Sequence, residues 1–71
     1  MIEIFRTNVR HKTAKKQVLE AIKAALPGLV ATLELDDNDK VLRVVGAWAP
    51  VQISRVIEVV KNQGFECELL D

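Results

Sequence analysis

The chain has 71 residues, of which 49% are hydrophobic, and its ten basic and ten acidic side chains cancel to zero formal charge. This length suffices for one domain, so we expect a single domain over residues 1–71 with a small but genuine core, which excludes a disordered chain. The balanced charge removes the simple electrostatic case for binding nucleic acid or an anionic membrane surface.

The first predicted element is a strand over Ile2–Thr7, which mixes β-branched and aromatic residues with charges. Successive side chains of a strand point to opposite faces, so Ile2 and Ile4 lie on one side and Phe5 on the other. Both sides carry apolar residues, and the sequence leaves open which of them is buried.

The second predicted element is an amphipathic helix that runs from Thr13, its expected N-cap, to Leu26. Val18 and Ile22 lie on its apolar face at helical spacing. Pro27 cannot continue the hydrogen-bond ladder and therefore ends the helix.

A β-hairpin is predicted next. Leu29–Leu35 alternates apolar and polar residues and Val41–Val45 is apolar and β-branched, while residues 36–40 have the composition of a turn. The connection that follows contains Trp48, which we expect to cover one end of the core or, if exposed, to anchor a partner.

A second helix and a final strand complete the chain. Pro50 is expected to open the helix, Ile57 to lie within its apolar stripe and Gly64 to cap its end. The last strand is predicted over Phe65–Leu70.

The order strand, helix, strand, strand, helix, strand predicts an α+β, ferredoxin-like βαββαβ fold, with both helices on one face of a four-stranded antiparallel sheet. Right-handed crossovers would place the first and third strands in the middle of that sheet.

The element order, the length, the sequence LPG after the first helix and KNQGFEC before the last strand together resemble the heavy-metal-associated domain family over essentially the whole chain. Members of that family carry copper or zinc, or form small domains of metal-pumping ATPases, and hold the metal with a Gly-Met-x-Cys-x-x-Cys loop. Counted back from LPG, the two cysteine positions fall about on Lys12 and Lys15, and the glycine and methionine about on Val9 and Arg10. The resemblance therefore implies the fold without the metal site, because a protonated lysine offers only donors and repels a cation.

The loop before the first helix holds the remaining site candidates. His11 is a weak candidate metal ligand, since one imidazole without a second strong ligand makes no tight site. Arg10, Lys12 and Lys15 form a candidate anion site with the first amides of the helix, although this loop lacks the glycines of a phosphate cradle. Cys67 is expected to be a small core residue with an unreactive thiol.

Other chemistry is not expected. Asp36, Asp37 and Asp39 lack the glycine and the distal glutamate of a calcium loop, so we predict a hairpin turn there. The predicted strand Val41–Val45 has no aromatic residue on which an RNA base could stack. No Ser-His, Cys-His or paired-carboxylate constellation is evident, so the chain is expected to be no enzyme and to need no cofactor.

The open face of the predicted sheet is the preferred interaction site. An apolar centre inside a charged rim is typical of a partner-binding surface, and the edge strands supply polar residues. The expected rim residues are Thr32, Glu34, Glu66 and Glu68. The residues expected at the centre of this face are Val41, Arg43 and Val45, joined by Ile2 and Ile4 or, if the first strand faces the other way, by Phe5.

Three functions are consistent with these patterns. The leading hypothesis is a non-enzymatic interaction module of heavy-metal-associated type that has lost its metal site and binds an unknown protein, or a second copy, through the open sheet face. The first alternative is a degenerate metal or anion carrier that uses His11 and the basic loop. The second is a small-molecule-sensing regulatory domain, by analogy of fold.

The expected location of the chain is the cytoplasm. A single cysteine cannot form an internal disulfide, and MIEIFRTN has charges where a signal peptide needs an apolar run. No segment of the sequence is apolar enough to span a membrane.

Overall fold

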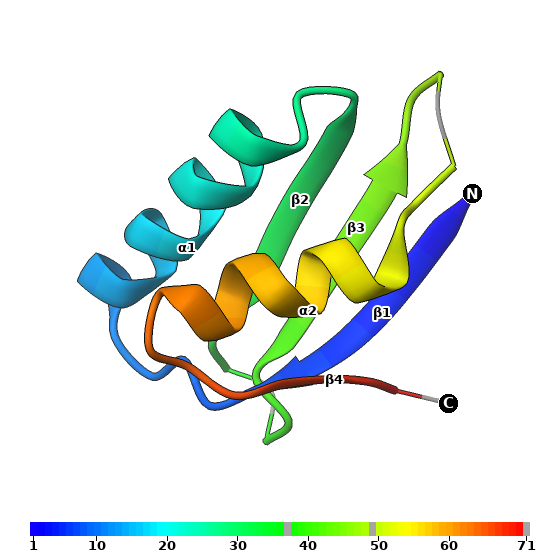
Figure 1. Ribbon diagram of the computed structural model, residues 1–71. Coiled ribbons are helices and arrows are strands. Elements are labelled where there is room, and N and C mark those ends of the chain that lie inside the picture. The colour runs from blue at the N-terminus through cyan, green and yellow to red at the C-terminus, as the bar shows by residue number, and fades with distance from the viewer. Residues whose placement is uncertain (37, 49, 71) are drawn as a thin grey trace.

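The computed structural model describes residues 1–36, 38–48 and 50–70. The elements in this part of the chain are β1 (Ile2–Thr7), α1 (Lys12–Ala25), β2 (Leu29–Glu34), β3 (Val41–Gly46), α2 (Ile53–Asn62) and β4 (Cys67–Leu69). The strands form one antiparallel sheet in the order β2-β3-β1-β4, and both helices cover the same face of it (Figure 1). The predicted ferredoxin-like fold, with the first and third strands in the middle, is confirmed.

The core lies between the sheet and the two helices, and β1 has one clearly buried side. Phe5 is fully buried opposite Leu42 of β3, which is also fully buried. Ile2 is exposed and Ile4 is half-buried on the open face. The question that the sequence left open is therefore settled in favour of Phe5 as the core residue. The other fully buried side chains are Val9, Val18, Ile22, Val44, Val56 and Val60.

The helix α1 begins earlier than predicted. His11 is the N-cap residue and its carbonyl accepts a hydrogen bond from the N–H of Lys15 at 2.9 Å, so Thr13 lies inside the first turn and is not the cap. No side chain caps this end, and the first turn contains no acidic residue. The fully buried Val9 lies two residues before this N-cap, so the chain enters the helix directly from the core through the exposed Arg10 and His11.

The helix α2 begins later than predicted. Gln52 is its N-cap residue, so Pro50 precedes the helix and does not occupy its first turn. The buried side chains of α2 are Val56, Val59 and Val60. Ile57 is only half-buried, because it lies at the margin of a stripe whose centre is Val56 and Val60.

The strand β4 is shorter than the predicted Phe65–Leu70. Gly64 follows the C-cap of α2 with a φ of 94°, a left-handed conformation that suits glycine. The N–H of Glu66 then donates to the side-chain Oδ1 of Asn8 at 2.8 Å. A side chain thus takes the place of a backbone ladder partner at this position, and pairing with β1 begins only at Cys67.

The difference in burial between Ile22 and Ile57 makes a test of these faces. We expect Ile22→Ala to lower the free energy of unfolding by about 2–5 kcal/mol, and Ile57→Ala by distinctly less. The exposed control Lys16→Ala is expected to change it by less than about 0.5 kcal/mol. Urea titration of the three variants would measure these differences. A cost for Ile57→Ala equal to that for Ile22→Ala would contradict the assigned packing of α2.

Candidate functional site

The loop between β1 and α1 is anchored firmly to its neighbours. The Thr7 hydroxyl donates to the carbonyl of Lys40 at 2.7 Å and accepts from the N–H of Val9 at 3.2 Å. On its other side the loop holds the connection before β4, through the bond from Glu66 to Asn8. The loop after β1, the turn before β3 and the connection after α2 therefore share one end of the molecule, as the element order predicts.

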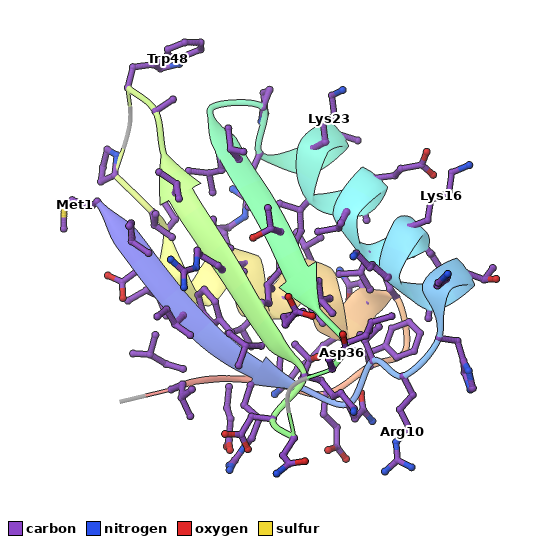
Figure 2. All side chains as sticks on the ribbon, turned by 180° about the vertical axis from the view of Figure 1, so that it is seen from behind. Met1, Arg10, Lys16, Lys23, Asp36 and Trp48 are labelled. Carbon is purple, nitrogen blue, oxygen red and sulfur yellow. The ribbon has the colours of Figure 1, made fainter. Side chains whose placement is uncertain are left out.

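This loop presents a basic surface. Arg10, His11 and Lys12 are exposed, and the side chain of Arg10 points away from the sheet (Figure 2). Lys12 and the half-buried Lys15 line a hollow against the end of β2 that does not include Arg10. The three residues of the candidate anion site thus divide between two directions. Within the part of the chain that the structure describes, none of their side chains forms a hydrogen bond or an ion pair.

The donor set at this end does not fit a soft metal ion. Lys12 and Lys15, which the sequence predicts to stand at the positions of the family cysteines, occupy the first turn of α1 and carry ammonium groups. His11 is exposed and, like every other described residue, belongs to no group of three His, Cys, Asp or Glu side chains that could hold a metal. Copper and zinc sites in proteins need thiolate or imidazole ligands in such groups.

Cys67 lies nearer to this loop than its sequence position suggests, since β4 places it opposite Thr7. The side chain is buried among core residues, however, and His11 is exposed. Burial raises the pKa of the Cys67 thiol from 9.0 to about 11, against a smaller lowering by the charge of Lys61. The thiol is therefore protonated at neutral pH, in keeping with the predicted structural role.

The turn between β2 and β3 forms the predicted hairpin. Asp36 is exposed and Asp39 lies within the turn, whereas Asp37 falls outside the described residues. Among the described residues of the turn, the left-handed one is Lys40, with a φ of 49°, and not Asp36, Asn38 or Asp39. Its ammonium group donates to the carbonyl of Leu35 at 3.0 Å, an interaction that helps to hold this conformation.

The open face of the sheet carries the residues predicted for it, but their arrangement differs from an apolar centre inside a charged rim. Val45 lies between Ile2 and Val30, whereas Val41 lies between Arg6 and Glu34. The row between these two joins Ile4, Arg43 and Thr32, and is extended by Leu70, whose N–H donates to the carbonyl of Ile4. The apolar residues therefore concentrate at one end of the face, and the charges, including the ion pair between Arg6 and Glu68, at the other.

We define the apolar end as Met1, Ile2, Val30, Val45 and Trp48. The N–H of Gly46 donates to the carbonyl of Met1 at 2.9 Å, which brings the start of β1 beside the end of β3. Trp48 is 85% exposed and projects beyond the sheet at this end (Figure 2), so the expectation that it covers the core is wrong. Of the large apolar side chains that are exposed in the described part of the chain, all but Leu69 belong to the apolar end.

Val30, like Met1, is a residue of this surface that the sequence patterns did not predict. It is 58% exposed on the open side of β2, a strand that was expected to contribute only polar residues to this face. The alternation of the inward-facing Leu29, Ala31 and Leu33 contained the signal, since it places Val30 on the same side as Thr32 and Glu34.

The raised pKa of Cys67 predicts a loss of stability in alkali. The thiol ionises near pH 9 in the unfolded chain and near pH 11 in the folded one, so the unfolded state loses its proton first as the pH rises. The free energy of unfolding should therefore fall by about 2 kcal/mol more in the wild type than in Cys67→Ala between pH 9 and pH 11. Denaturant titrations at a series of pH values would measure this, and parallel curves for the two proteins would contradict a buried, protonated thiol.

Comparison with known proteins places the chain by its fold. No family model matches the sequence, and no curated protein matches it. The yeast copper transporter domain CCC2A, solved in its apo and Cu(I)-loaded states, matches with a TM-score of 0.80 at 18% identity, over 99% of this chain and 94% of that one. The copper-binding domain from HMA7, a P-type ATPase, matches with a TM-score of 0.80 at 19% identity, over 99% of this chain and 93% of that one.

The resemblance predicted from the sequence is thus confirmed as a likeness of fold over the whole chain. Among the described residues, no helix has the length and apolar character needed to cross a bilayer. From β1 to β4, the chain has the ferredoxin-like fold of the copper-binding heavy-metal-associated domains.

Proposed function

We propose that this chain is a non-enzymatic protein-interaction module that keeps the fold of a copper-binding domain and has given up the metal site. The observation that carries the proposal is the gathering of exposed apolar side chains at the apolar end. Its site of action is expected to be the cytoplasm, since the chain has one thiol, which is free and buried.

The apolar end is the part of the surface that gains most from being covered. Each Å² of apolar surface removed from water stabilises a complex by about 25 cal/mol before the costs of association are counted. Trp48 and Val30 expose most of their surface, and aromatic residues are enriched among the anchors of protein interfaces. None of the five side chains of the apolar end is charged, although the α-amino group of Met1 places one positive charge beside them.

A second copy of the chain is the partner that this end fits most directly. A twofold contact places the same surface on both subunits, which an uncharged apolar patch satisfies without any further complementarity. A standard interface covers about 800 Å² on each partner, roughly a sixth of the 4694 Å² exposed by this chain. Such a contact would extend from the apolar end to the next row of the sheet, where Ile4 and Arg43 would form part of its rim.

The basic loop supports the other half of the proposal, the loss of metal binding. Two ammonium groups in the first turn of α1 raise the cost of bringing a cation to this position. The free thiol of the chain is protonated and buried, and the single imidazole is exposed. A carrier that used His11 and the loop would have to work without a second strong ligand from the described residues.

Self-association is tested by charge placed at the apolar end. Wild-type protein is expected to form dimers as its concentration rises to the millimolar range, seen as a rising mass in light scattering. The emission of Trp48 should shift to the blue in parallel, because this tryptophan is the only one in the chain and is exposed in the monomer.

The variant Val30→Glu should remain monomeric over the same range, whereas Val41→Glu should associate as the wild type does. These two changes are matched, since each places a glutamate in place of a valine on the open face, and Val41 lies at the charged end between Arg6 and Glu34. A wild type that stays monomeric, with no shift of Trp48 emission, would refute self-association through this end.

Metal binding is tested by competition. We expect the wild type to take up no stoichiometric Cu(I) or Zn²⁺ from a chromophoric chelator, because the loop lacks thiolate ligands. Lys12→Cys combined with Lys15→Cys should create measurable affinity, since these positions lie three residues apart in the first turn of α1. Lys16→Cys with Lys23→Cys is the control, in which two thiols on the same helix lie too far apart along it to share one ion. Retention of one metal per wild-type chain would overturn the proposed loss of the site.

A further inference from the structure

The outer edge of β2 is a free strand edge. The sheet order ends with β2, which pairs only with β3 among the described residues. At the start of the strand the carbonyl of Gly28 accepts from the N–H of Ala47, toward β3, while the N–H of Leu29 turns outward to the carbonyl of Leu26. In an antiparallel pair these directions alternate along the strand, so the N–H and C=O groups of Ala31 and Leu33 also point away from β3.

The helix α1 forms a wall beside this edge. Two adjoining hollows lie between α1 and β2, and Leu19 lines both of them. The helix contributes Lys12, Lys15 and Lys16 to the first hollow and Lys23 to the second. The second hollow lies against the start of β2, at Leu29, Val30 and Ala31, and the first lies against its end, at Glu34. Figure 1 shows α1 running beside β2 at this edge of the sheet.

The positive charge of this wall is only partly compensated. None of the four lysines forms an ion pair with any residue in the described ranges. Glu34 and Asp36 line the first hollow at its far end, and no acidic residue lines the second. The groove as a whole therefore carries an excess of positive charge, even though the chain is neutral overall.

The free edge of β2 and the lysines of α1 together favour one kind of ligand, an extended acidic peptide. An exposed edge accepts an extended peptide as an additional strand, bound by its main chain, while alternate side chains give the specificity. On this edge, every second side chain of the added strand would face α1. Acidic side chains at those positions meet the lysines, and apolar ones meet Leu19.

We propose that an extended, acidic peptide segment of a partner protein binds here as a fifth strand, paired with β2 and held by the lysines of α1. This site differs from the apolar end proposed for self-association, and each can hold without the other. The lysines then recognise the acidic side chains of the peptide, in addition to discouraging non-specific strand pairing at this edge of the sheet.

The test begins with a displayed library of random peptides long enough to span the six residues of β2. We expect selected peptides to carry Asp or Glu at alternate positions. In the complex with the best of them, hydrogen exchange at the outward amides of Ala31 and Leu33 should slow. Two versions of that peptide should then be compared, one N-methylated at its odd residues and one at its even residues. Only one of the two modifications should abolish binding, because only every second N–H group of the peptide would face β2.

The charge requirement is tested on the protein. Lys15→Glu, Lys16→Glu and Lys23→Glu combined should weaken the selected peptide by about tenfold or more, since three attractions become repulsions. Lys61→Glu, an exposed lysine on α2 away from the groove, should leave its affinity unchanged. Ile2→Glu should also leave peptide binding unchanged while it affects self-association, which separates the two proposals.

Three results would overturn the inference. The first is a library that yields no peptide with alternate acidic residues. The second is binding that tolerates N-methylation in both registers, which would show that no strand is added. The third is a single-stranded oligonucleotide that binds in the absence of any peptide ligand and is lost in the triple lysine variant, which would assign the groove to a nucleic acid.

Discussion

The register of β1 is the constraint on which the rest of this structure depends. The strand lies in the middle of the sheet, and the pairing of Phe5 with Leu42 turns the aromatic ring into the core. Because side chains alternate, that single choice places Ile2 and Ile4 on the open face, and a shift by one residue would exchange the two sets. It also directs Thr7 inward, where its hydroxyl joins the loop before α1 to the turn before β3. The position of the apolar end and the anchoring of the basic loop thus both follow from the burial of Phe5 in the core.

The basic loop shows that a shared fold does not determine the function of a domain. Two copper-binding domains share the fold of the chain at 18% and 19% identity, yet the loop here offers a buried Val9, an exposed Arg10 and an exposed His11, followed by lysines in the first turn of α1. A sheet and two helices fix where a loop sits and how rigidly it is held, and they leave its chemistry to the residues. Lys12 and Lys15 at the start of α1 even oppose the partial positive charge of the helix end, at a cost of a few tenths of a kcal/mol.

A structural feature could be predicted from the sequence when it depends only on residues that are close together along the chain. The period of the apolar residues identified the elements, their order and the buried Val18 and Ile22, since periodicity depends only on neighbours along the chain. The start of α1 was misplaced because the carbonyl of His11 accepts the first intrahelical bond without any side-chain cap, so the capping preference of Thr13 did not mark the boundary. The exposure of Trp48 was equally beyond reach, because a tryptophan in a connection gives no sign of whether the core has room for it. The groove beside β2 required both the sheet order and the side of α1 that overlooks it, and neither is a property of one segment.

The two proposed surfaces meet at one residue. Val30 belongs to the apolar end on the open face, and it also lines the second hollow beside α1. A strand added to β2 would widen the sheet next to Val30 and place new side chains alongside the row that it shares with Val45 and Ile2. Those side chains either extend the apolar end, and so strengthen the contact with a second copy, or interrupt it. In both cases the coupling is reciprocal, because whatever one ligand does to the affinity for another, the second does equally to the first. The identity of the side chain that a bound peptide sets beside Val30 therefore decides whether peptide binding and self-association support or oppose each other.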